Sequence, residues 1–269
     1  YKLWGSLLFL CAIALSLATP VWENDVSSVR YHQHLEASEK DEETKGDGFA
    51  THLPLVKIET GGTEIPGRAV KHEDGTYSYT TASDGSEFIS AHMDIVDHEF
   101  EYNHPGDKPS LSSKITIHVR GNSSRSFDKL SYAIRLVTED GQNNPQTVMG
   151  MDAHHEWALY GPYLDKTLLR NYMWYNIGGE LMDYAPNVRF CEVMLDGEYQ
   201  GVYVMTEKIT AGKNGARLPL TVSAKNNTFS GYLLQLNGDR PPSNDQLTEQ
   251  FTYCLLYTSP SPRDGATSR

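Results

Sequence analysis

The chain has 269 residues, a formal net charge of -12, and 39% hydrophobic and 10% aromatic residues. This composition is typical of a globular protein with enough apolar material for a sizeable core. The negative charge argues against binding nucleic acid or an anionic membrane through the overall field, so any phosphate group must be captured locally.

The N-terminal residues have the pattern of a secretory signal peptide. Lys2 precedes an apolar run from Leu7 to Leu17, and Ser16 and Ala18 stand where small residues precede a cleavage site. We therefore predict a signal peptide over residues 1–18, with an incomplete start because no initiating Met is present. The run is shorter than the ~20 apolar residues of a transmembrane helix, so a membrane anchor is the less favoured alternative. We expect a secreted or cell-surface protein with no membrane span after signal removal.

The next segment, residues 19–50, is rich in charged residues, and its apolar residues show no regular spacing. Between residues 23 and 47, eight acidic residues stand against three basic ones. We predict an acidic disordered linker here, because such a segment cannot bury enough apolar surface to order itself.

Residues 51–110 are predicted to be rich in β-strand. A short strand is expected from Leu53 to Ile58, and a small antiparallel sheet between residues 76 and 102. Within it His92, Asp94 and His98 recur at strand spacing. We interpret them as the wet face of the sheet rather than as metal ligands, because alternating polar residues are usual on such a face.

A hairpin with a small-residue loop is predicted from residue 115 to residue 136, at the start of a segment that covers residues 111–253. Apolar and polar residues alternate on both sides of the loop, which places Arg120 and Lys129 on the polar face at the two ends of the connection. The residues between them are Gly121, Asn122, Ser123, Ser124, Arg125 and Ser126. Their backbone N–H groups and hydroxyls, together with the charges of Arg120, Arg125 and Lys129, suit a nucleotide phosphate. An ordinary polar hairpin loop is the alternative.

A helix is predicted from an Asp165 cap to about residue 182. Leu169, Met173, Ile177 and Leu181 recur at i, i+4 spacing and are expected to form its buried stripe. Arg170 falls on the opposite side with Asn171 beside it. Arg170 either has a functional role, or is a solvated helix charge, or forms an ion pair with a nearby acid.

Asp196 and Gly197 predict a second hairpin, over residues 188–195 and 199–207, with another strand at residues 231–236. Glu207 follows the apolar second strand and either pairs with a lysine such as Lys208 or contacts Lys129 or the nucleotide. Cys191 is expected to be buried packing, and no disulfide is expected, because Cys11 lies in the signal peptide and Cys254 in the tail.

Two sequons occur, at Asn122 and Asn226. Asn226 lies in a predicted surface loop and can carry a glycan. Asn122 lies in the proposed phosphate loop, where a glycan would block the ligand, so we expect it to be unmodified.

The string RGNSSRSFDKLSY resembles the RGNSS…KKSY signature of the CotH (spore-coat protein H) family of atypical, secreted protein kinases. The likeness runs from about His52 to about Tyr253 and includes EWALYGPYLDKTLLRN, YAPNVRFCEVMLDGEYQGVYVMTEKI and GYLLQLNGD, in the family's order. It implies an α+β fold, an atypical protein-kinase-like N-terminal lobe with a mostly antiparallel sheet and one main helix. It also implies ATP and Mg as cofactors.

By this resemblance Lys129 is the catalytic lysine. Arg120, the loop residues 121–125 and Glu207 bind ATP, and Arg170 and Asn171 match an Arg-Asn pair of the family pattern. No H-R-D or D-F-G string of ordinary kinases is present. The full form is expected to phosphorylate Ser or Thr of coat or other secreted proteins.

Residues 254–269 look like translated cloning adaptor, so the family's catalytic and metal-binding acids are expected to be missing and this chain inactive. The alternative is a non-enzymatic coat or surface structural protein, or a host-cell adhesin. Its partner would be a coat or cell-surface protein.

Overall fold

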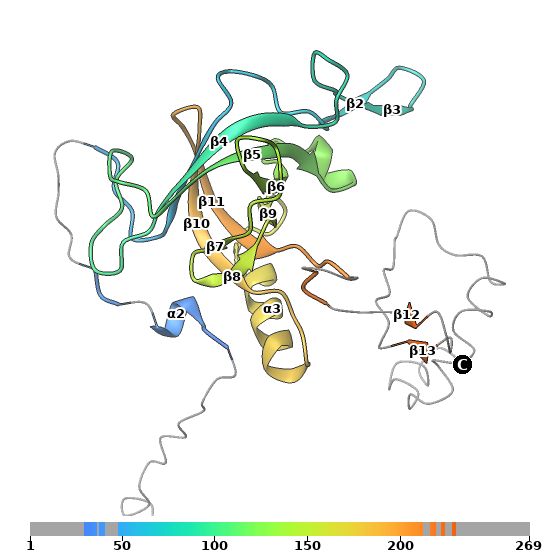
Figure 1. Cartoon of the computed structure of the whole chain (residues 1–269). Coiled ribbons are helices and arrows are strands. Elements are labelled where there is room, and N and C mark those ends of the chain that lie inside the picture. The colour runs from blue at the N-terminus through green and yellow to red at the C-terminus, as the bar shows by residue number, and fades with distance from the viewer. Residues whose placement is uncertain are drawn as a thin grey trace, which may run out of the picture. The chain divides into compact units, whose positions relative to one another are not determined.

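The computed structural model describes residues 30–36, 38–40, 48–211, 216–218, 222–223 and 228–229 (Figure 1). The chain divides into two compact units, residues 1–209 and residues 210–269. In the second unit the described strands are β12 (Val222–Ser223) and β13 (Thr228–Phe229), which pair antiparallel. The predicted signal peptide, the strand at 231–236, the sequon at Asn226 and the tail lie outside the described residues.

Seven strands of the first unit close into a barrel, in the order β1-β10-β11-β9-β6-β5-β4. Neighbouring strands are antiparallel except for β1 and β10, which run parallel, with Leu55 opposite Glu192. The strands are β1 (Leu55–Glu59), β4 (Ile89–Val96), β5 (Leu111–Arg120), β6 (Ser131–Val137), β9 (Glu156–Tyr160), β10 (Val188–Leu195) and β11 (Glu198–Glu207).

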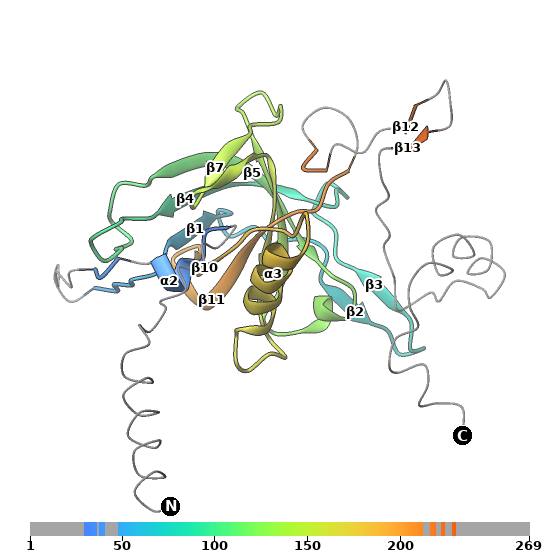
Figure 2. The ribbon, with the colours of Figure 1, turned by 90° about the horizontal axis from the view of Figure 1, so that it is seen from below.

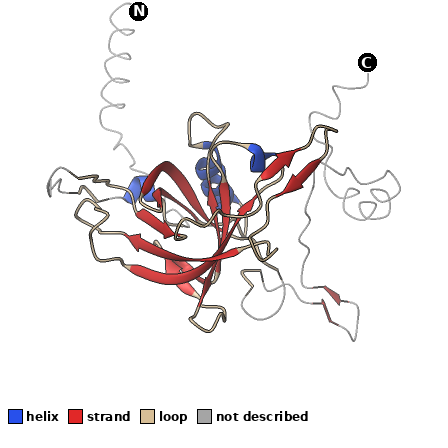
Figure 3. Ribbon diagram, turned by 90° about the horizontal axis from the view of Figure 1, so that it is seen from above, coloured by secondary structure: helices blue, strands red, loops and turns tan. Residues whose placement is uncertain are grey.

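Short elements complete the unit, although strands make up most of it (Figure 3). Two small hairpins lie outside the barrel ladder, β2 (Ala69–Lys71) with β3 (Tyr77–Tyr79), and β7 (Gln146–Val148) with β8 (Met151–His154). The helical elements are α2 (Gln33–Glu36), the 3-10 turn η1 (Ser123–Ser126) and α3 (Arg170–Leu181). Among the described residues, no helix has the length and apolar character that crossing a membrane requires.

Alternation along the strands explains the core. On β5 the side chains of Ile115, Ile117 and Val119 are fully buried inside the barrel, whereas Thr116 and His118 lie on the outer face. Trp157 of β9 fills the interior and donates its indole N–H to the carbonyl oxygen of His154 over 3.0 Å. The mainly antiparallel fold with one main helix confirms the α+β prediction. The sheet is closed by the parallel β1–β10 pair, so the predicted kinase-lobe sheet is instead a seven-stranded barrel.

Helix α3 packs against the outer face of β10 and β11, beside which it lies in Figure 2. Its buried face is Tyr172 and Asn176, and the Tyr172 ring stacks on Phe190 with centroids 4.4 Å apart. The predicted buried stripe was wrong, because its four residues are 39–78% exposed. Both faces of the helix carry apolar side chains, so spacing alone could not indicate which face meets the sheet.

Residues 30–36, here called the N-terminal strap, hold α3 and β10 together. The Arg30 guanidinium donates to the carbonyl oxygens of Tyr175 and Pro186 over 3.0 and 2.8 Å. His32 Nε2 lies 2.6 Å from Glu180 Oε1, and the Gln33 side chain bonds both the N–H and the carbonyl of Phe190. The disordered-linker prediction is therefore wrong for this part of residues 19–50.

Candidate functional site

The loop between β5 and β6 is folded on itself rather than open. Gly121 has φ +112°, and a side chain there would clash with the Ser124 hydroxyl, so glycine is required. Arg125 Nε donates to the Gly121 carbonyl over 2.6 Å, and its guanidinium lies 4.5 Å from the centroid of the Tyr79 ring. Ser126 donates to the Ser123 carbonyl. Arg125 therefore closes the loop and ties it to the β2–β3 hairpin.

Lys129 lies apart from Arg120. Its Nζ donates to the Val202 carbonyl over 2.7 Å and sits 4.5 Å from the centroid of the Tyr203 ring, which belongs to the barrel interior. Burial lowers the Lys129 pKa. Arg120 is exposed on the outer face of β5, at the end of that strand. The expectation that Arg120 and Lys129 flank a common hollow is not met, because residues 127–130 are not strand and the alternation stops there.

The outer face beside Arg120 carries a cavity of about 490 Å³, here called the outer-face cavity. Its lining is mixed in charge: basic side chains come from Lys114, His118, Arg135 and Lys208, and acidic ones from Glu139, Asp140 and Glu156. Burial lowers the pKa of His118, and three cations lower it further, Arg125, Lys208 and Arg120 in that order of size. Four basic groups thus gather at one edge of this face, although neither Lys129 nor the loop lines the cavity.

Two buried polar side chains beside this face have no hydrogen-bond partner. Thr206 Oγ1 and both polar atoms of the Asn176 amide are buried and unpaired. Val204 of β11 packs with Tyr172 of α3. Thr206 lies two residues after Val204 and Asn176 lies one helical turn after Tyr172, so both residues are on the faces that meet between β11 and α3. Buried polar groups normally pair, but neither residue lines the outer-face cavity, so both are features of the α3–β11 interface rather than of that cavity.

Glu207 is buried and bonded to neither lysine that the sequence suggested. Its carboxylate accepts from the N–H and the side-chain amide of Asn187, over 2.9 and 3.3 Å. Lys129 instead bonds the carbonyl of Val202, which stands five residues before Glu207 on β11. Five residues correspond to about 17 Å of strand, so the contact made by Lys129 lies far from the Glu207 carboxylate. Lys208 instead pairs with Glu156 over 2.6 Å.

Arg170 is largely exposed at the start of α3, and its Nε lies 3.7 Å from Asp165 Oδ1, as the ion-pair alternative expected. Asn171, beside it, is partly buried. Asp165 Oδ2 also accepts the Arg170 N–H over 2.8 Å, so Asp165 caps the helix although α3 begins five residues after it.

The three residues weighed as metal ligands are separated. His92 contacts Asp94 and Ser112, whereas His98 pairs with Asp107. Within the part of the chain that the structure describes, no group of three or more His, Cys, Asp or Glu side chains could hold a metal ion.

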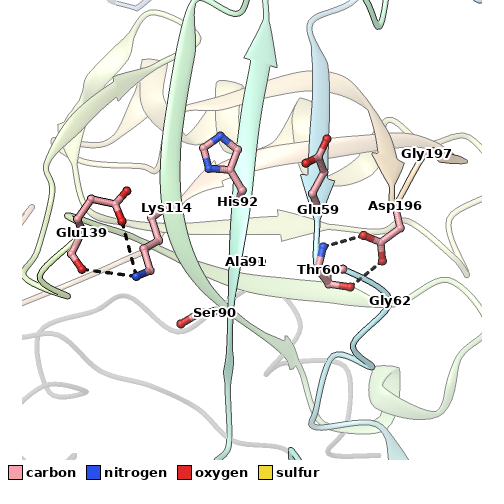
Figure 4. A pocket seen from close by; sticks show the side chains of 11 residues that line it. Glu59, Thr60, Gly62, Ser90, Ala91, His92, Lys114, Glu139, Asp196 and Gly197 are labelled. Carbon is pink, nitrogen blue, oxygen red and sulfur yellow. Dashed lines mark hydrogen bonds and ion pairs between the residues drawn. The ribbon is translucent and has the colours of Figure 1, made fainter.

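An open polar hollow of about 690 Å³ lies on the outer face of β1, β4 and β5 (Figure 4). Lys114 pairs with Glu139 at one side, and Thr60 bonds Asp196 at the other. Two pairs of its polar residues are therefore engaged with each other, whereas Glu59 and His92 are drawn in Figure 4 without a contact to another residue of the hollow.

The family model for the CotH kinase protein matches residues 117–254. The chain belongs to this family. The match begins inside β5, so β1 and β4, which close the barrel, precede it. A comparison with curated proteins gives no match. Family membership confirms the resemblance that RGNSSRSFDKLSY indicated.

Sequence reasoning did not single out His118, Asn176 or Thr206, and it named Lys208 only as a partner of Glu207. The alternation of β5 placed His118 on the face of Arg120, two residues away, and so offered a signal. Asn176 and Thr206 had none, because their lack of partners depends on how α3 packs on β11.

Proposed function

We propose that this chain carries the nucleotide-binding part of a secreted CotH-type protein kinase. Its full form transfers phosphate from Mg-ATP to Ser or Thr of coat or other secreted proteins. Membership in the CotH kinase family supports a kinase-like, coat- or surface-associated protein. The carrying observation is the group of basic side chains at and beside the outer-face cavity: His118 and Lys208 line it, with Lys208 paired to Glu156, and Arg120 lies two residues from His118 on the same face of β5.

The residues present fit the phosphate chain of ATP. Phosphoryl transfer depends on positioning and on stabilising negative charge, which guanidinium and ammonium groups provide. Arg120 is exposed on the same face of β5 as His118, and its guanidinium is therefore accessible to phosphate oxygens. In this proposal Arg120 and Lys208 bind phosphate oxygens, His118 donates when protonated, and Lys129 supports the barrel.

Magnesium would neutralise charge on the β- and γ-phosphates. The described residues do not fit a metal, because they form no group of three or more suitable ligands. We therefore derive no step through magnesium from these residues.

The test is ATP titration of the purified chain by calorimetry, without added metal, comparing wild type with Arg120→Gln. Loss of one charge-assisted contact should weaken binding about ten-fold. Lys71→Gln, which removes an exposed cation on β2, is the matched control and should change affinity less than about two-fold. Equal affinity of the Arg120 variant and wild type, with both folded by circular dichroism, would exclude this site.

A non-enzymatic surface protein or adhesin is the second candidate, and the exposed stripe of α3 favours it. Leu169, Trp174 and Leu181 are 53%, 64% and 78% exposed, and exposed apolar patches often bind proteins. No ATP binding by wild type, together with binding to coat or cell surfaces that Leu181→Glu abolishes, would support this candidate over the kinase.

A further inference from the structure

One mouth of the barrel contains a second pocket, with a volume of about 730 Å³. The residues before β1, after β4, in the β7–β8 turn and at the start of β10 surround it, and the N-terminal strap covers it. Helix α2 of the strap lies beside β10 in Figure 2, and its Gln33 bonds Phe190 of that strand. This mouth pocket shares no lining residue with the outer-face cavity, so it is a separate site.

Arg189 forms part of the pocket wall and is only 5% exposed. Its Nε donates to the Met149 carbonyl over 3.2 Å and its Nη1 to the Val188 carbonyl over 2.9 Å. The Tyr31 ring lies 4.3 Å from the guanidinium carbon. Among the described residues, no carboxylate forms an ion pair with Arg189, and its Nη2 bonds no protein acceptor. A buried guanidinium is normally paired with an anion, so this one is available to a ligand.

Asp97 lines the same pocket from the end of β4. It forms no hydrogen bond or ion pair with any residue that the structure describes. Burial raises its pKa, while Lys40, His98 and Arg189 act in the opposite direction. Arg189 is thus near enough to act on this carboxyl, but the two groups do not meet. Asp97 and the Arg189 guanidinium, whose Nη2 is left after two hydrogen bonds to carbonyls, thus line one pocket, together with Lys40, whose Nζ donates to the His98 carbonyl.

The remaining wall is mixed. Tyr31, Phe190 and Pro54 contribute rings, and Met149 contributes its thioether. The polar part of the wall is made by Gln33, His34, Ser38, His52, His98 and Glu99. A purely anionic ligand would approach Asp97, and a purely cationic one would approach Arg189. A molecule that carries both charges and an apolar group satisfies all three parts of the pocket.

We propose that the mouth pocket binds a free α-amino acid with an apolar side chain, its carboxylate on Arg189 and its ammonium group on Asp97. The side chain packs against Tyr31 and Phe190. This site is independent of the proposed ATP site, because the two cavities share no lining residue.

The experiment titrates the whole chain with L-phenylalanine and with two analogues that each lack one charge. The analogues are 3-phenylpropionate, without the ammonium group, and phenethylamine, without the carboxylate. Calorimetry should show that L-phenylalanine binds roughly ten-fold or more tightly than either analogue, since each analogue leaves one buried charge unpaired.

The decisive variant is Asp97→Asn, which keeps the shape of the side chain. It should weaken L-phenylalanine binding roughly ten-fold and leave 3-phenylpropionate binding equal or tighter. Asp94→Asn, on the same strand but outside the pocket, is the control and should change neither. The proposal is overturned if L-phenylalanine does not bind up to its solubility limit, or if Asp97→Asn weakens all three ligands equally.

Discussion

Replacing Lys129 by Met separates a structural lysine from a catalytic one. The change removes the hydrogen bond to the Val202 carbonyl and the contact of the ammonium group with the Tyr203 ring. A hydrogen bond to a charged group contributes about 1.5–3 kcal/mol and a cation–π contact about 0.5–2 kcal/mol. Methionine retains the packing of the stem and avoids the desolvation of the amine, so we expect a net loss of about 1–3 kcal/mol.

Urea unfolding followed by circular dichroism measures that loss, which corresponds to a fall in melting temperature of roughly 3–10 °C. ATP titration of the same variant should change affinity less than about two-fold, whereas Arg120→Gln should show the reverse pattern, with normal stability and weak binding. Unchanged stability of Lys129→Met together with a loss of ATP binding beyond about ten-fold would refute this reasoning. Lys129 would then leave Val202 to bind phosphate, as the sequence hypothesis held.

Three further predictions concern single contacts. In Gly161→Ala the new β-carbon would lie 2.5 Å from the Leu130 carbonyl oxygen, so urea unfolding should show a loss of roughly 1–3 kcal/mol. Gly106→Ala, with no atom within 4 Å, should stay within about 0.5 kcal/mol of wild type. Burial raises the Cys191 pKa, so iodoacetamide should modify this thiol only after unfolding, as peptide mass spectrometry would show. A hydrogen bond from the Thr167 hydroxyl is the main reason why the pKa of Asp165 lies below its ordinary value. Asp165→Asn should therefore be less stable than wild type near pH 7, and the difference in urea midpoint should shrink below about pH 4, as the wild-type carboxylate takes up a proton.

Local patterns predicted the parts of the fold that depend on near neighbours. Alternation placed Ile115 and Ile117 inside the barrel, and Asp196 with Gly197 predicted the turn that joins β10 to β11. The glycine at position 121 has the positive φ that a tight small-residue loop requires. Burial of Cys191 was also confirmed.

Long-range packing decided the features that the sequence did not predict. The parallel β1–β10 pair joins residues more than 130 positions apart, and nothing in either strand signals that it closes a barrel. The same holds for α3, whose two faces are both apolar and whose orientation is set by Tyr172 meeting Phe190. Lys129 was misplaced because the alternation of β6 was extended two residues beyond the start of the strand.

Glu207 shows how one such contact changes the interpretation of a site. A carboxylate at the end of a buried strand needs a partner, and the sequence offered only lysines near it or in the hairpin. The structure supplies Asn187, whose side-chain oxygen accepts from Arg30 over 2.8 Å, and Glu207 in turn raises the Arg30 pKa against the effect of burial. Arg30 stands in an acidic stretch with no periodicity, so its role could not be inferred locally. Because Arg30 also bonds the Tyr175 carbonyl of α3, Glu207 belongs to the structure that positions α3, and its effect on the outer-face cavity is indirect.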